Sequence, residues 1–255
     1  MGTCLIVPCY NEANRLDVAS FRAFLAERTG VQILFVDDGS RDQTIKVLEE
    51  VRSGYEDSVS ILSRLKNGGK AEAVRGGILH ALDRFHPAFV GFWDADLATP
   101  LDALLRFSET FAAKAELEMV FGARVQLLGR HIECKALRHY AGRVFASIVS
   151  VVLRMKIYDT QCGAKLFRVT DESRQVFADP FISKWVFDVE ILARYQALLG
   201  RTPEQLQRII YEYPLEKWTD IGGSKVRASD FAIAFVDVFR IYWSYLAGGS
   251  ARLNQ

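Results

Sequence analysis

The chain has 255 residues and a mass of 28.8 kDa, and 50% of its residues are hydrophobic, so it can bury a substantial core in one large domain or two small ones. Its 32 basic residues nearly balance its 31 acidic ones, which excludes the overall positive field that attracts nucleic acid. The four cysteines form no C-x-x-C pair and have no histidine at metal spacing, which argues against a zinc site or a disulfide framework and favours a reduced, cytoplasmic setting.

Segments typical of strands and helices alternate along the first half of the chain. Strands are predicted in "TCLIVPCYNE", "VQILFVDDGS" and "SVSILSR" and at residues 88–93, and the first of them ends in a loop. Helices are predicted at residues 18–27, 41–53 and 70–85, with Ser40 or Asp42 able to cap the second. This order predicts an α/β fold, with a mostly parallel central sheet flanked by helices as in Rossmann-like proteins.

The second half continues the alternation with longer loops. A helix at 101–115 is followed by a strand at 118–125, a basic loop and a helix at about 137–155. "YDTQCGAKLFRV" is predicted to be a loop that leads into a strand, followed by a helix at 185–199 and a strand in "RIIYEYPLEKW". The polar segment "TDIGGSKVRASD" then precedes an apolar helix from residue 231, and no repeat or linker divides the chain.

The longest apolar stretches are residues 144–153 and 231–246. Each is too short, or too interrupted by charge, for the ~20 apolar residues that a membrane span needs, so no transmembrane segment is expected. Packing against their own domain is the simpler expectation, and contact with a bilayer surface is the alternative. A strand begins within a few residues of Met1, so no secretory leader is expected.

Loops with unusual chemistry follow four of the predicted strands, at residues 8–14, 37–40, 65–70 and 94–98. The carboxyl ends of parallel strands line the ligand crevice of an open α/β sheet, so these loops should converge on one site.

Two carboxylates, Asp94 and Asp96, interrupt the apolar run "VGFWDADLATP". If the chain is extended here, both side chains point the same way and repel unless a cation lies between them. Oxygen ligands favour Mg²⁺ or Mn²⁺, and a site with few protein ligands leaves positions for phosphate oxygens. The alternative is that one aspartate caps the next helix and the other faces solvent.

Two further segments point to a nucleotide. Asp37 and Asp38, in "DDGS", can accept hydrogen bonds from a ribose or a base edge, although they also suit a simple turn. "NGGKAEAVRGG" places Lys70 and Arg75 near a helix start, where free amides favour anions. The segment matches neither the P-loop nor the G-x-G-x-x-G pattern, which disfavours a P-loop NTPase or a Rossmann dehydrogenase.

The segments "IVPCYNEANRL", "ILFVDDGSRDQT", "KNGGKAEAVRGGI" and "DADLATP", in this order, resemble the nucleotide-sugar half of the family 2 glycosyltransferases with the GT-A fold. In the second half, "DTQCGAKLF", "WVFDVEIL" and "GGSKV" resemble the branch that makes polyprenyl-phosphate glucose, the dolichyl-phosphate β-glucosyltransferases. The resemblance covers nearly the whole chain. It implies a single GT-A domain over residues 1–255, with a nucleotide-sugar-binding half at 1–115 and an acceptor-binding half at 116–255 that ends in the C-terminal helix.

The resemblance also implies a site. The expected metal ligands are Asp94 and Asp96, and the expected catalytic residues are Asp96, Asp188 and Arg124. The expected donor-binding residues are Pro8, Tyr10, Glu12, Asp37, Asp38, Lys70, Arg75, Asp94, Ala95, Asp96, Ser224 and Lys225. The expected acceptor-binding residues are Arg124, Arg138, Arg143, Gln161, Lys165 and Trp185. The family often has L-Q after the second aspartate, and here Leu97-Ala98 removes a third possible metal contact.

The implied reaction is inverting, metal-dependent transfer of glucose from UDP-glucose to a polyprenyl phosphate. A lipid phosphate is already anionic and needs little help from a base, whereas bringing it to a diphosphate requires cations, and arginine binds phosphate with two parallel bonds. No counterpart of the eukaryotic relatives' N-terminal anchor is seen, so attachment is expected at the cytoplasmic face of the membrane through the apolar stretches or a partner membrane protein. GDP-mannose as donor, a non-lipid acceptor, a homo-oligomer and a nucleotide-sugar-binding protein without catalysis remain alternatives.

Overall fold

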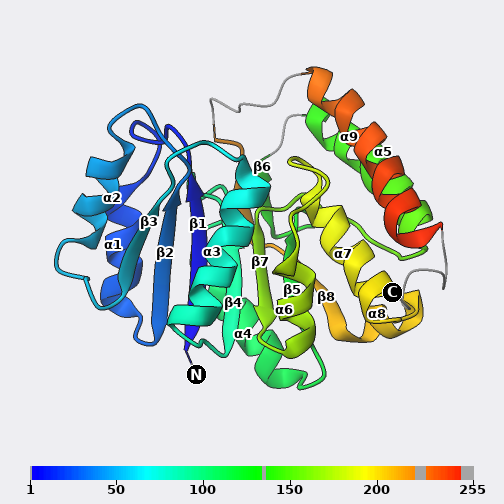
Figure 1. Cartoon of the computed structure of the whole chain (residues 1–255), viewed down its shortest axis with the longest axis horizontal. Coiled ribbons are helices and arrows are strands. Elements are labelled where there is room, and N and C mark those ends of the chain that lie inside the picture. Colours follow the sequence, from blue (N-terminus) through cyan, green and yellow to red (C-terminus); the bar gives the residue numbers. More distant parts are fainter. Residues whose placement is uncertain (1, 134–135, 222–227, 248–255) are drawn as a thin grey trace.

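A seven-stranded sheet forms the centre of the protein (Figure 1). The computed structural model describes residues 2–133, 136–221 and 228–247, without the side chains of residues 136–139 and 228–232. The strand order is β3-β2-β1-β4-β7-β5-β8, and β7 alone among these seven runs antiparallel to its neighbours. The strands are β1 (Thr3–Cys9), β2 (Val31–Asp37), β3 (Val59–Ser63), β4 (Phe89–Trp93), β5 (Met119–Ala123), β7 (Ala164–Arg168) and β8 (Ile210–Pro214), and a separate parallel pair joins β6 (His131–Glu133) to β9 (Lys217–Thr219). The predicted mostly parallel α/β architecture is confirmed.

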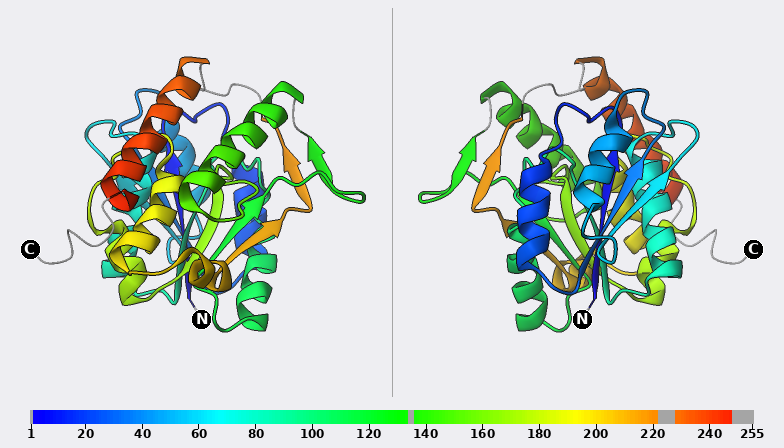
Figure 2. Two further views of the ribbon diagram at one scale, coloured as in Figure 1. Left: turned by 90° about the vertical axis from the view of Figure 1, so that its right-hand side faces the viewer. Right: turned by 90° about the vertical axis from the view of Figure 1, so that its left-hand side faces the viewer.

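Helices lie on both faces of the sheet (Figure 2). They are α1 (Val18–Glu27), α2 (Thr44–Arg52), α3 (Lys70–Arg84), α4 (Ala103–Ala113), α5 (Ala136–Leu153), α6 (Asp171–Ala178), α7 (Phe187–Leu198), α8 (Pro203–Ile209) and α9 (Ala228–Ile241), which continues as a π-helix, η1 (Tyr242–Leu246). Asp17 caps α1 by accepting from Ser20 N at 3.0 Å. Of the two candidate caps for α2, it is Asp42 that bonds its first residue, accepting from Thr44 N at 3.0 Å.

Side-chain alternation along the strands divides the core into two layers. Ile6 and Phe92 belong to the layer beneath α3, α5, α6, α7 and α9. Their neighbours Val7 and Trp93 belong to the layer beneath α1, α2 and α4. Both faces of the strands are therefore buried, which is why these strands read as continuous apolar runs.

The antiparallel strand β7 brings the second half of the chain to the end of β4. Trp93 pairs with Ala164, and the amide of Asp94 donates to the carbonyl oxygen of Gly163 at 3.1 Å. The loop before β7 thus meets the loop after β4 at the carboxyl edge of the sheet.

Three local features differ from the sequence analysis or were missing from it. The strand predicted at 208–218 begins only at Ile210, because residues 203–209 form α8, and it ends at Pro214, after which the chain crosses to β6. The short helix α6 was not expected. Residues 94–97 form a turn in which Leu97 N donates to Asp94 O at 3.1 Å and Leu97 has a φ of 52°, so Asp94 and Asp96 do not lie on an extended strand.

No helix in the parts of the chain described above is both long and apolar enough to cross a membrane.

Candidate active site

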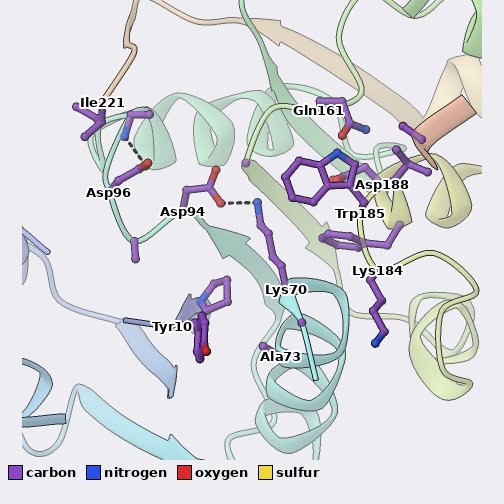
Figure 3. A pocket seen from close by; sticks show the side chains of 18 of the residues that line it. Tyr10, Lys70, Ala73, Asp94, Asp96, Gln161, Lys184, Trp185, Asp188 and Ile221 are labelled. Atoms are coloured by element: carbon purple, nitrogen blue, oxygen red, sulfur yellow. Dashed lines mark hydrogen bonds and ion pairs between the residues drawn. The ribbon is translucent and has the colours of Figure 1, made fainter. Parts of the chain in front are cut away.

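A cavity of about 570 Å³ opens at the carboxyl ends of β1, β2 and β4 and extends to α5 and α7 (Figure 3). Residues from both halves of the chain line it, so the four loops expected to converge do share one site with the second half. In Figure 3, Asp94 and Lys70 face each other, with Asp96 on one side of them and Asp188, Trp185 and Gln161 on the other. The predicted residues that line it are Pro8, Tyr10, Glu12, Asp38, Lys70, Asp94, Ala95, Asp96, Arg124, Arg143, Gln161, Trp185 and Asp188.

Asp94 forms an ion pair with Lys70, the first residue of α3. Lys70 Nζ lies 2.5 Å from Asp94 Oδ1. Desolvation alone would lower the pKa of Lys70, but the carboxylates of Asp94 and Asp188 outweigh it and raise that pKa, so the amine stays charged at neutral pH. Gly163 leaves the space for this carboxylate, since a Cβ there would lie 1.9 Å from Asp94 Oδ2.

Asp96 is held by a different cation. Arg15 Nη2 lies 2.9 Å from Asp96 Oδ2, and Arg15 Nη1 also lies 3.2 Å from Glu12 Oε2. The other oxygen of Asp96 accepts from Ala98 N at 3.2 Å. Each of the two carboxylates in this turn is therefore paired with a basic side chain.

Asp38 organises the loop that leads into α3. Its carboxylate accepts from Gly68 N at 3.0 Å and from Gly69 N at 2.8 Å, and it pairs with Arg64 at 3.1 Å. This places Lys70 at the cavity. Asp37 is buried and accepts from Ser40 N at 3.2 Å, so it stabilises its own turn.

Arg124 faces the cavity with its guanidinium engaged by Asp159. Nε and Nη2 of Arg124 donate to the two carboxylate oxygens at 2.6 and 2.7 Å, and the guanidinium carbon lies 5.2 Å from the centre of the Trp218 ring. Burial alone would raise the pKa of Asp159, but Arg124 outweighs it and holds that pKa below its usual value. Arg124 therefore places a positive charge, fixed by Asp159, at the wall of the cavity.

Arg143, on α5, contacts Tyr158 among the residues that the structure describes. Its guanidinium carbon lies 3.6 Å from the centre of the Tyr158 ring, and its Nη1 donates to Tyr158 O at 2.8 Å. Stacking fixes the plane of the group and leaves its other N–H donors for an anion.

Asp188 lies in the first turn of α7, where it lines the cavity and pairs with Lys165. Lys165 Nζ lies 3.0 Å from Asp188 Oδ1, and both residues are buried. The same amine donates to the carbonyl oxygens of Thr160 and Cys162 at 2.9 and 2.7 Å. Burial raises the pKa of Asp188 and outweighs the opposing effect of Lys165 and Lys70.

Some predicted residues lie elsewhere. Arg75 points away from the cavity, donating to Glu72 and to the carbonyl oxygen of Ala178. Asp37 and Lys165 lie behind the cavity wall, where they hold its loops. Ser224, Lys225 and the side chain of Arg138 lie outside the residues that the structure describes.

Several residues that line the cavity were not singled out from the sequence, among them Arg15, Asp159, Gly163 and Lys184. Arg15 carried a readable signal, since it is a lone basic residue in a polar loop and stands three positions after Glu12. The other three depend on contacts between distant segments that periodicity does not reveal.

Two helices beside the cavity expose apolar side chains. Helices α5 and α9 contact each other through Phe145 and Phe235, whose ring centres are 5.8 Å apart. Their outer surfaces, with η1, expose Tyr140, Val144, Val151, Ile233, Val236, Phe239 and Trp243. Since α5 also lines the cavity through Gly142 and Arg143, this apolar surface adjoins the site.

The carboxylate oxygens at the end of β4 fit a divalent ion that is bound partly by the protein and partly by a ligand. Asp94 and Asp96 supply hard oxygen atoms, and no cluster of three His, Cys, Asp or Glu side chains suited to a metal occurs within the described ranges. An ion held there by two carboxylates keeps positions for diphosphate oxygens, as Mg²⁺ sites commonly do.

The family model and the similar proteins all point to glycosyltransferases. The sequence model of "Glycosyl transferase family 2" matches residues 4–170. The chain is 32% identical over 258 residues to a dolichyl-phosphate beta-glucosyltransferase of Dictyostelium discoideum, covering 96% of this chain and 75% of that protein. A human protein of the same name is 32% identical over 239 residues, covering 87% and 68% respectively.

Solved structures with the same fold are more distant in sequence. Glucosyl-3-phosphoglycerate synthase from Mycobacterium tuberculosis, in complex with Mn²⁺, UDP-glucose and phosphoglyceric acid, has a TM-score of 0.65 at 15% identity and covers 96% of this chain and 79% of that one. A mannosyltransferase from Pyrobaculum calidifontis, in complex with GDP-Man and Mn²⁺, has a TM-score of 0.59 at 16% identity, covering 95% and 63%. These similarities show the GT-A fold that the motifs predicted. With the family model matching more than half of the chain, and the Asp94–Asp96 turn at the end of β4, the protein belongs to glycosyl transferase family 2.

Proposed function

We propose that this glycosyltransferase moves glucose from UDP-glucose to a polyprenyl phosphate and inverts the anomeric centre. The observation that carries the proposal is one cavity that joins the Asp94–Asp96 turn to an arginine-bearing helix with an exposed apolar surface. The dolichyl-phosphate beta-glucosyltransferases to which the chain is about one-third identical support this donor and acceptor.

The donor occupies the side of the cavity formed by the first half of the chain. Pro8, Tyr10 and Glu12 surround the nucleoside, and Asp38 keeps the loop before α3 in place for it. Lys70 orients Asp94 toward the sugar and the ribose.

Asp94 and Asp96 would hold Mg²⁺ or Mn²⁺ together with the diphosphate. When bound, such an ion withdraws charge from the leaving diphosphate as a Lewis acid. A synthase with the same fold was solved with Mn²⁺ and UDP-glucose, which supports this assignment.

The acceptor phosphate enters from the side of α5. Arg143 binds it through the donors that Tyr158 leaves open, and Arg124 adds positive charge beside it. These cations offset the repulsion between the acceptor and the donor diphosphate. A phosphate oxygen then forms a bond to the anomeric carbon, and the bond from that carbon to the β-phosphate oxygen breaks, with its electron pair leaving on UDP.

Asp188 acts through its neighbours. Its carboxylate pairs with Lys165, whose amine donates to the carbonyl oxygens of Thr160 and Cys162 and so fixes the loop before β7. The negative charge of Asp188 also helps to keep Lys70 charged. We assign it to positioning the sugar and the acceptor loop rather than to proton removal, since a phosphate acceptor carries its own negative charge.

The lipid tail leaves the cavity along α5 and α9. The apolar side chains that these helices expose would rest on the cytoplasmic face of a membrane, so that the protein binds peripherally. Homo-oligomers and a partner membrane protein remain compatible with the same surface.

Transfer of labelled glucose from UDP-glucose to a short polyprenyl phosphate in detergent tests the proposal. The reaction is run with Mn²⁺ or Mg²⁺, with a chelator, and with GDP-mannose in place of UDP-glucose. We expect a metal-dependent glucolipid from UDP-glucose, lost in Asp96→Asn and kept in the surface control Asp102→Asn, whose residue is exposed at the start of α4.

Other outcomes would redirect the assignment. Hydrolysis of UDP-glucose without lipid product would retain the donor and reject the lipid acceptor, and preference for GDP-mannose would reject the donor. Binding of UDP-glucose with no turnover of any acceptor would indicate a binding protein.

A further inference from the structure

Arg15 links two loops of the donor side that are far apart in the sequence. It stands between β1 and α1, and its Nη2 lies 2.9 Å from Oδ2 of Asp96, 81 positions further on. Its Nη1 lies 3.2 Å from Glu12 Oε2, three positions before it. One guanidinium group thus holds both a loop carboxylate and the carboxylate that is the best candidate for a metal ligand.

This ion pair is largely shielded from water. The side chains of Arg15 and Asp96 are 21% and 22% exposed, so solvent screens their attraction less than on an open surface. Arg15 Nε is buried and has no hydrogen-bond partner among the residues that the structure describes. A buried donor that lacks an acceptor is costly, and it is suited to an anionic oxygen that arrives later.

We propose that Arg15 occupies the metal's place on Asp96 until the donor binds, and that it then binds the diphosphate. This inference rests on the proposed use of a divalent ion and a nucleotide sugar. On donor binding, Asp96 would give up its ion pair with Arg15 and bind the ion instead, while Glu12 keeps Arg15 at the edge of the cavity. The released Nη2 and the unpartnered Nε then donate to diphosphate oxygens.

Charge balance explains why the exchange suits the site. Without donor, Arg15 and Lys70 offset the carboxylates of Asp96 and Asp94. A divalent ion and the two negative charges of a nucleotide-sugar diphosphate enter together as a neutral unit, so Asp96 gains the ion and Arg15 gains the phosphate. A divalent ion that enters alone has to displace Arg15 from Asp96, and the displaced guanidinium group then has no phosphate to pair with.

Metal and nucleotide should therefore bind cooperatively. In the wild type the ion alone binds weakly, because it competes with Arg15 for Asp96. Removing the guanidinium should strengthen binding of the ion alone and weaken the mutual reinforcement between ion and nucleotide, which is equal in both directions by linkage.

Mn²⁺ binding, followed by loss of the paramagnetic resonance signal of the free aqueous ion, tests this without measuring activity. The wild type and Arg15→Met are titrated with and without saturating UDP. Without UDP, Arg15→Met should bind Mn²⁺ about fivefold more tightly than the wild type, the scale of one partly exposed ion pair. With UDP, this advantage should vanish or reverse, since the diphosphate has lost a donor.

Arg106→Met is the matched control, because Arg106 forms an ion pair with Glu109 outside the cavity and should leave Mn²⁺ binding unchanged. If thermal unfolding shows that Arg15→Met is not folded, Arg15→Gln removes the charge but keeps a polar side chain, and it should give the same result.

Two results are decisive against the inference and separate it from the proposed function. The first result has two parts: without UDP the wild type and Arg15→Met bind Mn²⁺ equally well, and with UDP the wild type binds Mn²⁺ whereas Asp96→Asn does not. This result overturns the role of Arg15 and leaves the metal assignment in place. Absence of Mn²⁺ binding by the wild type even with UDP overturns the metal assignment and the inference together.

Discussion

Replacing Gly163 by alanine should lower the activity by about 100-fold while leaving the protein folded. The added methyl group would lie 1.9 Å from Oδ2 and 2.2 Å from Cγ of Asp94. Ordinary contact needs about 3.4 Å, so the carboxylate would have to move by about 1.5 Å. Such a shift breaks the 2.5 Å pair with Lys70 and moves Asp94 away from the position in which it is proposed to bind the nucleotide sugar.

The size of the effect follows from that displacement. Misplacing a reacting group by about 1 Å costs on the order of 100-fold in rate, or about 2.7 kcal/mol of transition-state stabilisation. Overpacking costs about 1–3 kcal/mol of folding free energy, which lowers Tm by roughly 2–12 °C in a chain of this size. Gly163 is not among the glycines with positive φ, so its backbone accepts a side chain.

The assay compares kcat/KM for glucosyl transfer and Tm in Gly163→Ala and Gly142→Ala. Gly142 also lines the cavity, and a Cβ there meets nothing within 4 Å, so the control should keep full activity and a similar or slightly higher Tm. Folded Gly163→Ala protein with kcat/KM within threefold of the wild type would refute the reasoning that the position of the Asp94 carboxylate limits activity.

Three further substitutions test other parts of the site. Arg143→Gln should raise KM for the lipid phosphate by about 10- to 100-fold and leave UDP affinity unchanged; equal loss of both would place Arg143 on the donor. Asp159→Asn should lower the free energy of unfolding at neutral pH by about 3 kcal/mol, because it leaves Arg124 without its carboxylate. The pKa of Asp159 is lower in the folded state than in the unfolded state, so the stability that Asp159 contributes is present above the unfolded pKa near 4 and is lost on acidification. In denaturant titrations, the free energy of unfolding should therefore fall less below about pH 4 in the variant than in the wild type. Trp243→Ser should weaken sedimentation with phospholipid vesicles by about threefold or more, whereas Ile45→Ser on α2 should not; identical binding of both variants would exclude η1 as a membrane contact.

The sheet could be predicted because its signals are local. Apolar runs that end in polar loops mark β1, β2 and β4, and the rule that such loops meet at the carboxyl edge places Lys70 and Asp94 together. The capping box of α8 was also readable, since Thr202 is followed by Pro203 and then by Gln205, yet the β-branched run after it suggested a strand.

The pairings inside the site could not be predicted. Arg124 looked like a free phosphate ligand, and only the approach of the segment before β7 shows that Asp159 takes two of its donors. Asp96 looked like one half of a carboxylate pair in need of a metal, whereas the turn at Leu97 directs it to Arg15. Propensity and periodicity describe single elements, and these contacts depend on how distant elements meet.

The reversed direction of β7 has a consequence for folding and for attempts to divide the protein. The backbone amide of Asp94 donates to the carbonyl oxygen of Gly163, so Asp94 cannot reach its final position until the later segment has been synthesised and paired. A fragment of residues 1–115 would leave the edge of β4 bare, and unpaired strand edges promote aggregation. The two halves should therefore function as separate polypeptides only when they are produced together and reassemble along the seam between β4 and β7.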